Sequence, residues 1–302
     1  MLDEHVATKA APPAEADGVV AVSLAATGWT IFFESCPDVA AGVEQVLGAW
    51  NPQRLDPRDA HFDLRISKLA SGYAWHAPGR PRPKLWDERP SRTTMNVVSD
   101  IHDAFIDWYL TERPHLFCLH AAAVLSPAGL VCFPSTRKAG KSTLCAQMAA
   151  DGSQLFGDDV LPVDPETGMA LALGLPIMLR RPLPKELPQG TTAFVRERTG
   201  PKGPRWLYLC LRPGEIAPFD AQARIAAFIL LRRNQSGEAR LNPIDPSTVL
   251  SEVIMQNLAN KTASHRVLDC MADLVGRSSC YELVYSDTAQ AARIAAAAAR
   301  SR

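Results

Sequence analysis

The sequence has 302 residues, of which 47% are apolar, so it can form one large domain or two smaller ones with a conventional hydrophobic core. Lys and Arg together number 32, as do Asp and Glu, and this balance argues against nucleic acid and an anionic membrane as partners. No uninterrupted apolar run approaches the roughly 20 residues that would span a bilayer, and the seven scattered Cys include no CxxC pair, which favours core residues in a reducing cytoplasm over zinc or redox chemistry.

The N-terminal third is predicted to be a tail followed by a small α+β unit. Residues 1–17 are acidic and rich in Ala and Pro, and they lack the basic flank and apolar run of a secretory signal, so we expect a disordered tail. Residues 18–110 form the unit, in which the Pro-rich segment Pro78–Arg92 is a loop because proline disrupts regular backbone hydrogen bonding. Its other elements are strands at Trp29–Phe33, Phe62–Ile66 and Gly72–His76 and helices at Val39–Trp50 and Asn96–Leu110.

A β-hairpin is predicted after Pro114, with Phe117–Leu125 and Leu130–Phe133 on either side of a Ser-Pro-Ala-Gly turn. Its second strand leads directly into a candidate phosphate loop, Ser135–Thr143. A helix is expected next, and then one strand that runs through Gly157-Asp158-Asp159. These elements are Ser142–Ala150, Gln154–Phe156 and the continuation Val160–Val163.

The rest of the chain alternates between strands, helices and one long segment, Pro176–Pro204, which is rich in Pro, Arg and Lys. We predict that this segment is a loop, and a loop of that length in a compact domain is usually functional or disordered. The other predicted elements are strands at Met169–Leu173, Trp206–Leu211, Ile225–Leu231 and Cys280–Val284 and helices at Pro246–Asn260, Ser264–Leu274 and from Thr288 onward.

The candidate phosphate loop fits the P-loop pattern G-x-x-x-x-G-K-[ST] at every defined position except the first, where Ser135 replaces Gly. It lies between a predicted strand and a predicted helix, so backbone amides and the helix N-terminus can bind phosphate oxygens together. Lys141 would contact the β- and γ-phosphates of ATP, and Ser142 would offer its hydroxyl to Mg²⁺. A Gly-Lys-Ser at a helix start can also arise by chance, because Gly and Ser are common there.

Two features of the loop affect how tightly it is expected to bind a nucleotide. If the first position needs a positive φ, the Ser135 side chain costs roughly a kcal/mol and weakens binding. Arg137 and Lys138 could attract a triphosphate, although solvated side chains at a loop tip are an equal alternative. The predicted nucleotide-binding residues are Ser135, Thr136, Arg137, Lys138, Ala139, Gly140, Lys141, Ser142 and Thr143.

Two further groups are candidates for chemistry. Asp158 and Asp159 end a short apolar strand about 20 residues after the P-loop, where one carboxylate can hold the metal and the other can accept a proton from an attacking hydroxyl. An Asp pair at a strand end is also common in turns. His120, on the strand before the phosphate loop, could reach the phosphates, and the alternative is a core histidine with satisfied hydrogen bonds.

The order His120, hairpin, P-loop, helix and Gly-Asp-Asp resembles the catalytic domain of HPr kinase/phosphorylase, and especially the HPr-kinase-related proteins that include lasso-peptide kinases. The resemblance covers about Phe117 to Val163. It implies that residues 111–302 form an α/β, phosphoenolpyruvate-carboxykinase-like P-loop domain that phosphorylates a serine of a peptide or small protein with ATP and Mg²⁺.

By position, the resemblance implies that Asp158 is the base, that Asp159 lies beside the metal with Ser142, and that Lys141 and His120 complete the catalytic group. Ser135 and Thr143 depart from the classical loop and its following acidic residue, and the downstream signature of the family is missing, which argues against the reverse phosphorylase reaction. Arg180 and Arg181 could clamp a phosphate, or they could be solvated loop residues.

The sequence therefore predicts a kinase with a peptide or small-protein substrate, and it leaves homo-oligomer formation open. A kinase for a small molecule on the same scaffold is one alternative, because a fold does not fix a substrate. A regulatory module that binds nucleotide without transfer is the other. The presence of Lys141, Ser142 and both aspartates argues against the regulatory module, because a loop that binds nucleotide without phosphate transfer needs no general base.

Overall fold

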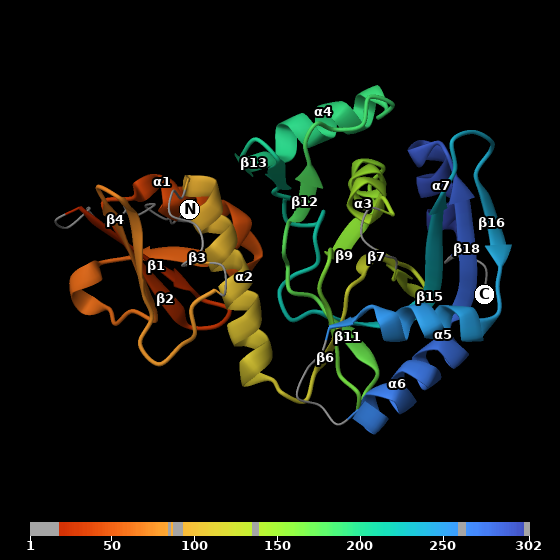
Figure 1. Ribbon diagram of the computed structural model, residues 1–302, viewed down its shortest axis with the longest axis horizontal. Coiled ribbons are helices and arrows are strands. Elements are labelled where there is room, and N and C mark those ends of the chain that lie inside the picture. The colour runs from red at the N-terminus through yellow and green to blue at the C-terminus, as the bar shows by residue number, and fades with distance from the viewer. Residues whose placement is uncertain (1–17, 84–85, 87–92, 135–138, 259–263, 299–302) are drawn as a thin grey trace, which may run out of the picture.

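The computed structural model describes residues 18–83, 86, 93–134, 139–258 and 264–298, and it has a mixed α/β fold. The predicted tail and four residues of the predicted phosphate loop, Ser135, Thr136, Arg137 and Lys138, lie outside the described residues. Figure 1 shows a small sheet on one side of helix α2 and a larger sheet on the other.

The small sheet has five strands in the order β3-β1-β2-β4-β5. Its strands are β1 (Val19–Leu24), β2 (Trp29–Glu34), β3 (Pro52–Leu55), β4 (Leu64–Leu69) and β5 (Gly72–His76). Two helices, α1 (Pro37–Val46) and α2 (Thr94–Glu112), belong to the same hydrophobic core as the apolar face of this sheet. The predicted strands and helices of this region are present, whereas β1 and β3 were missed; β3 is short, and most of its side chains are exposed.

The small sheet and α2 contact the larger part of the protein through buried aromatic residues. Trp50 is fully buried, and its Nε1 donates a hydrogen bond of 2.6 Å to the backbone oxygen of Leu173. The hydroxyl of Tyr109, on α2, donates a hydrogen bond of 2.9 Å to Asp220. Because Leu171 and Leu173 belong to the same hydrophobic cluster as Trp50, the two parts share one core.

The larger sheet has ten strands, and a path of eight follows the order β17-β6-β10-β11-β15-β8-β7-β9. Its strands are β6 (Phe117–Leu119), β7 (Ala122–Ser126), β8 (Gly129–Phe133), β9 (Gln154–Gly157), β10 (Leu161–Val163), β11 (Met169–Leu171), β15 (Gln222–Arg233), β16 (Arg240–Pro243), β17 (Asn257–Leu258) and β18 (Ser279–Tyr285). The hairpin of β7 and β8 is confirmed, with Ala122 opposite Phe133.

Two predicted strands of this region are each divided into two. The segment expected to run from Phe117 to Leu125 becomes β6 and β7, because β6 pairs with β10 whereas β7 pairs with β8 and β9. The strand expected to continue through the Asp pair likewise becomes β9 and β10. The chain changes direction at His120 and at Asp158-Asp159, so polar side chains gather where the strands break.

The prediction of a long loop over Pro176–Pro204 is wrong. The segment contains β12 (Ile177–Arg180), α4 (Gln189–Arg198) and β13 (Thr199–Lys202), and β12 and β13 both pair with β14 (Trp206–Leu209). Most of the prolines lie between these elements, where they do not interrupt backbone pairing. Pro201 lies on the short strand β13.

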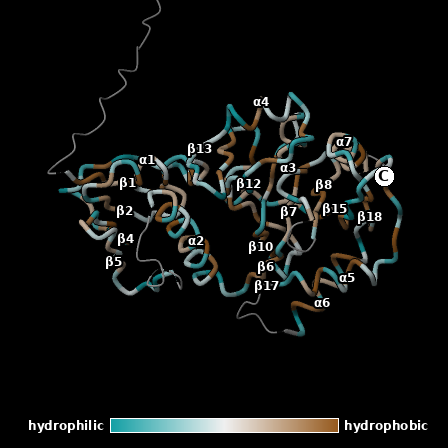
Figure 2. Tube along the Cα trace, turned by 45° about the horizontal axis from the view of Figure 1, so that its top comes forward, coloured by the Kyte–Doolittle hydropathy of each residue, from teal (hydrophilic) through white to brown (hydrophobic). Residues whose placement is uncertain are grey.

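Helices cover the larger sheet. The helices α3 (Lys141–Ala150) and α7 (Thr288–Ala298) share a core with β7, β8 and β18. On the other side, α5 (Pro246–Met255) and α6 (Ser264–Arg277) share a core with β6, β10 and β15. Along α6 the tube in Figure 2 alternates between hydrophilic and hydrophobic residues, as expected of a helix with one buried face.

Among the described helices, none combines the length and the apolar character needed to cross a membrane. Six of the seven cysteines are buried, in agreement with the expected core role, and Cys210 is half-buried.

Candidate active site

The described end of the phosphate loop lies between the buried strand β8 and helix α3. Gly140 caps α3 with a φ of 96°, a conformation that favours glycine because other residues place a Cβ against the backbone. A Cβ at this position would also lie 2.7 Å from the hydroxyl of Tyr285, which donates a hydrogen bond of 3.2 Å to the backbone oxygen of Ala139. The second motif glycine is thus required both by its backbone conformation and by this contact.

Lys141 is the first residue of α3, and only 5% of its surface is exposed. Its Nζ lies 3.4 Å from Nε2 of His120 and 4.0 Å from Oδ1 of Asp159. Burial lowers the pKa of the Lys141 ammonium, and the negative charges of Asp159 and Asp158 oppose this shift. A buried cation at the start of a helix is well placed to bind an anion, because both the charge and the helix dipole favour it.

Asp158 follows β9 and is 6% exposed. The hydroxyl of Ser142 donates a hydrogen bond of 3.1 Å to its Oδ1. Burial raises the pKa of Asp158 to about 7, and the charge of Asp159 adds to this rise, whereas the hydrogen bond from Ser142 and the charge of Lys141 oppose it. The carboxyl group can therefore gain or lose a proton near neutral pH.

Asp159 is more accessible, with 45% of its side chain exposed. Its φ of 64° is in the left-handed region, which Asp tolerates better than most residues. Its Oδ1 lies 3.1 Å from Nε2 of His120. The backbone amide of His120 donates a hydrogen bond of 2.7 Å to the backbone oxygen of Gln256, which holds the break between β6 and β7.

The oxygen donors of this cluster suit Mg²⁺. Ser142, Asp158 and Asp159 supply one hydroxyl and two carboxylates, and Mg²⁺ in nucleotide sites is commonly held by one or two carboxylates together with phosphate and water oxygens. Among the described residues, no group of three or more His, Cys, Asp or Glu side chains could hold a metal ion by itself.

Five of the predicted catalytic or metal-binding residues come together, although they lie on three separate segments of the chain. His120 comes from the break after β6, Lys141 and Ser142 from α3, and the two aspartates from the break after β9. Thr143 lies in the first turn of α3.

The two arginines considered for a phosphate clamp are exposed at and just after the end of β12, and each has a contact near β14. The guanidinium of Arg180 lies 4.9 Å from the ring centre of Trp206. Nη1 of Arg181 donates a hydrogen bond of 2.7 Å to the backbone oxygen of Gly203.

Sequence reasoning missed Tyr285, which contacts the loop from 146 positions away. No local pattern marks this tyrosine, because its contact with the loop depends on the pairing of β15 with β18.

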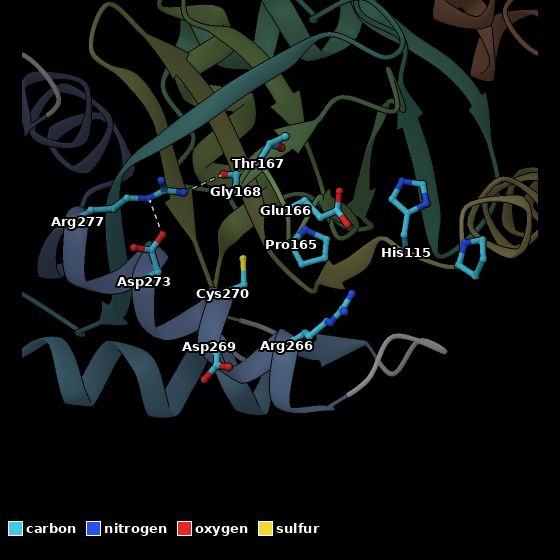
Figure 3. Close-up of a pocket in the computed structure, with 11 residues that line it drawn as sticks. His115, Pro165, Glu166, Thr167, Gly168, Arg266, Asp269, Cys270, Asp273 and Arg277 are labelled. Carbon is cyan, nitrogen blue, oxygen red and sulfur yellow. Dashed lines mark hydrogen bonds and ion pairs between the residues drawn. The ribbon is translucent and has the colours of Figure 1, made fainter.

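A cavity of about 710 Å³ lies away from these residues, where the turn after β10 faces α6 (Figure 3). In that view Arg266 extends from α6 toward Glu166, and Arg277 pairs with Asp273 and with the backbone oxygen of Gly168. None of the predicted site residues lines this cavity.

A scan against protein-family models found no match for this chain, and no curated protein matches its sequence.

Proposed function

We propose that this protein is an ATP- and Mg²⁺-dependent kinase that transfers the γ-phosphate to a serine hydroxyl of a peptide or small protein, on a phosphoenolpyruvate-carboxykinase-like P-loop scaffold. The observation that carries the proposal is the convergence of Lys141, Ser142 and the Asp158-Asp159 pair at the end of the phosphate loop. A nucleotide-binding lysine, a metal-binding hydroxyl and two carboxylates are the groups that phosphoryl transfer requires.

Each residue has a role in the proposed reaction. Lys141 binds the β- and γ-phosphates, and Ser142 and Asp159 hold Mg²⁺, which when bound neutralises charge on the phosphate oxygens. Asp158 takes the proton from the acceptor serine as its oxygen attacks the γ-phosphorus, and ADP leaves with the electron pair of the broken P–O bond. His120 orients Asp159 through their contact of 3.1 Å.

One contact supports an exchange of roles between the two aspartates. Because Ser142 donates its hydrogen bond to Asp158, that carboxylate lies beside the hydroxyl assigned to Mg²⁺. Asp159 is the more accessible carboxylate and could meet an acceptor from solvent. Separate substitutions of the two residues distinguish the assignments.

Nucleotide binding is tested by thermal unfolding. ATP with Mg²⁺ should raise the Tm, because a ligand that binds only the folded protein stabilises it by about RT ln(1 + [L]/Kd). Lys141→Ala should lose most of this increase, whereas Lys202→Ala, at an exposed position of β13, should keep it. An equal increase in all three proteins would show that the nucleotide binds elsewhere.

Transfer is tested with ATP labelled at the γ-phosphate and an array of serine-containing peptides, each paired with a copy in which alanine replaces the serine. Label should enter only peptides that contain serine. Asp158→Asn should still bind ATP with Mg²⁺ but lose transfer by roughly 10²–10⁴-fold, the usual contribution of a general base. Asp159→Asn should instead weaken the dependence on Mg²⁺ and the affinity for ATP together.

If Asp158→Asn transfers phosphate at the wild-type rate, Asp158 is not the base. The reverse pattern, with lost transfer in Asp159→Asn and weakened Mg²⁺ dependence in Asp158→Asn, would establish the exchanged roles. Label that appears equally on the alanine copies would exclude a serine acceptor.

A further inference from the structure

The strand that leads into the phosphate loop is next to a parallel strand that ends in an exposed arginine. The strands β8, β15 and β18 are neighbours, and β15 is parallel to both of the others. Their carboxyl ends therefore lie at the same edge of the sheet, where α/β proteins commonly bind ligands. Arg233 is the last residue of β15 and pairs with Tyr285, the last residue of β18.

Tyr285 connects this edge to the phosphate loop. Its side chain is buried, and its hydroxyl donates to the backbone oxygen of Ala139. Burial raises the pKa of this hydroxyl, and the positive charge of Arg233 opposes the shift, as expected of neighbouring side chains. Paired residues of adjacent strands point to the same face of a sheet, so Arg233 lies on the same face as the contact between Tyr285 and the loop.

A cavity of about 490 Å³ opens at this edge. It is lined by one cation, one anion, two carboxamides and one hydroxyl, from the ends of β15 and β18 and from the loop between β12 and α4. These residues are Glu186, Arg233, Asn234, Gln235 and Ser286.

The cavity is connected to the phosphate loop through Tyr285. The hydroxyl of this residue donates to the backbone oxygen of Ala139, and its strand neighbour Arg233 lines the cavity. The backbone amide of Asn234 also donates a hydrogen bond of 2.7 Å to the backbone oxygen of Tyr285, so the end of β15 is tied to the residue that contacts the loop. A ligand with phosphates on the loop could therefore place its remaining part in the cavity.

We propose that the cavity between Glu186, Arg233 and Gln235 holds the nucleoside of a triphosphate whose phosphates lie on the loop at Gly140 and Lys141. This inference rests on the proposed function and identifies the part of the site that distinguishes a nucleotide from an inorganic polyphosphate.

The lining residues suit a nucleoside. Carboxamides both donate and accept hydrogen bonds, so Asn234 and Gln235 can pair with the edge of a base. A guanidinium stacks on aromatic rings, which suits Arg233 to the face of the base, and the Glu186 carboxylate can accept hydrogen bonds from ribose hydroxyls. Nη2 of Arg233 and Oε2 of Glu186 are 4.0 Å apart, and both side chains are exposed, so their ion pair is weak and can be replaced at low cost.

The neighbouring Arg232 provides a matched control. Successive residues of a strand point to opposite faces, so Arg232 faces away from the cavity. Its Nη2 pairs with Oε1 of Glu282 at 2.7 Å. A substitution there removes the same charge from almost the same place in the sheet without touching the cavity lining.

The test compares ATP with inorganic tripolyphosphate, both with Mg²⁺, by titration calorimetry. Wild-type protein should bind ATP more tightly than tripolyphosphate. Arg233→Ala and Gln235→Ala should each weaken ATP binding by about tenfold, which corresponds to about 1.4 kcal/mol, and should leave tripolyphosphate binding within about twofold. Arg232→Ala should leave both affinities unchanged. The Tm of each free variant shows whether it is folded, and Gln235→Ala keeps every charge of the site.

Two results would overturn the inference while the phosphate site stands. The first is that wild-type protein binds ATP and tripolyphosphate with equal affinity. The second is that Arg233→Ala lowers the affinity for both ligands equally while Gln235→Ala leaves both affinities unchanged. If neither ligand binds to wild-type protein, both the proposed function and the nucleoside site fail. Lys141→Ala should weaken the binding of both ligands equally and so measure how much the phosphates contribute to affinity.

Discussion

Replacing Asp158 by Asn should stabilise the metal-free protein at alkaline pH, although it removes the base that the proposed reaction needs. Asp158 is 6% exposed, and burial raises its pKa from 3.8 to about 7. Because the folded-state pKa is the higher one, the folded protein binds more protons than the unfolded chain between these values. Its stability therefore falls as the pH rises from about 4 to about 7.

The size of the effect follows from the pKa difference. Holding a carboxylate at this position above pH 7 costs on the order of 4 kcal/mol, at about 1.4 kcal/mol for each pH unit between the two pKa values. Asparagine avoids this cost but weakens the hydrogen bonds that the carboxylate accepts from Ser142 and from the backbone of Met178. Each of these is worth about 1 kcal/mol. At pH 8 the free energy of unfolding of Asp158→Asn should exceed that of wild-type protein by about 2 kcal/mol, and this difference should shrink as the pH approaches 4.

Urea unfolding at pH 5 and pH 8, in the presence of EDTA, measures this difference. The control is Asp269→Asn, at an exposed position of α6, which should change stability equally at both pH values. If the stability difference between Asp158→Asn and wild-type protein does not grow from pH 5 to pH 8, burial does not disfavour the charged form of Asp158.

Three further substitutions test single contacts. Gly140→Ala should lower the Tm and weaken ATP binding by more than tenfold, because the added Cβ clashes with Tyr285 and the residue must keep a positive φ. The control is Gly152→Ala, which has a φ of 92° and open space around it, so it should lower the Tm only by the modest amount that a positive φ costs. Tyr285→Phe should weaken ATP binding by a few-fold, measured by calorimetry. Trp50→Phe should cost about 1–3 kcal/mol in urea unfolding, because the carbonyl of Leu173 loses its buried partner.

The elements that sequence reasoning predicted well are those with strong local signals. Helix α2 has regularly spaced apolar residues and a capping box at Thr93, and it was predicted within two residues at each end. The strand before Gly140 and the helix that begins at Lys141 were predicted because the motif and its flanking elements are contiguous in the chain.

The errors occur where pairing with a distant segment overrides local composition. The density of proline over Pro176–Pro204 suggested a loop, yet β12 forms because its backbone pairs with β14 about 30 residues later. Likewise, His120 marks a break between two strands because β6 pairs with β10 and β17, which follow it by more than 30 residues.

The residue types of the candidate site follow from the chain itself, since Gly140, Lys141 and Ser142 belong to one short motif and the two aspartates follow a short strand. Their arrangement depends on the assembled sheet. Pairing of β6 with β10 brings His120 to Asp159, and pairing of β15 with β18 places Arg233 beside Tyr285, which contacts the phosphate loop. Such contacts join segments far apart in sequence, and local propensity carries no information about them because they form only when strands share backbone hydrogen bonds.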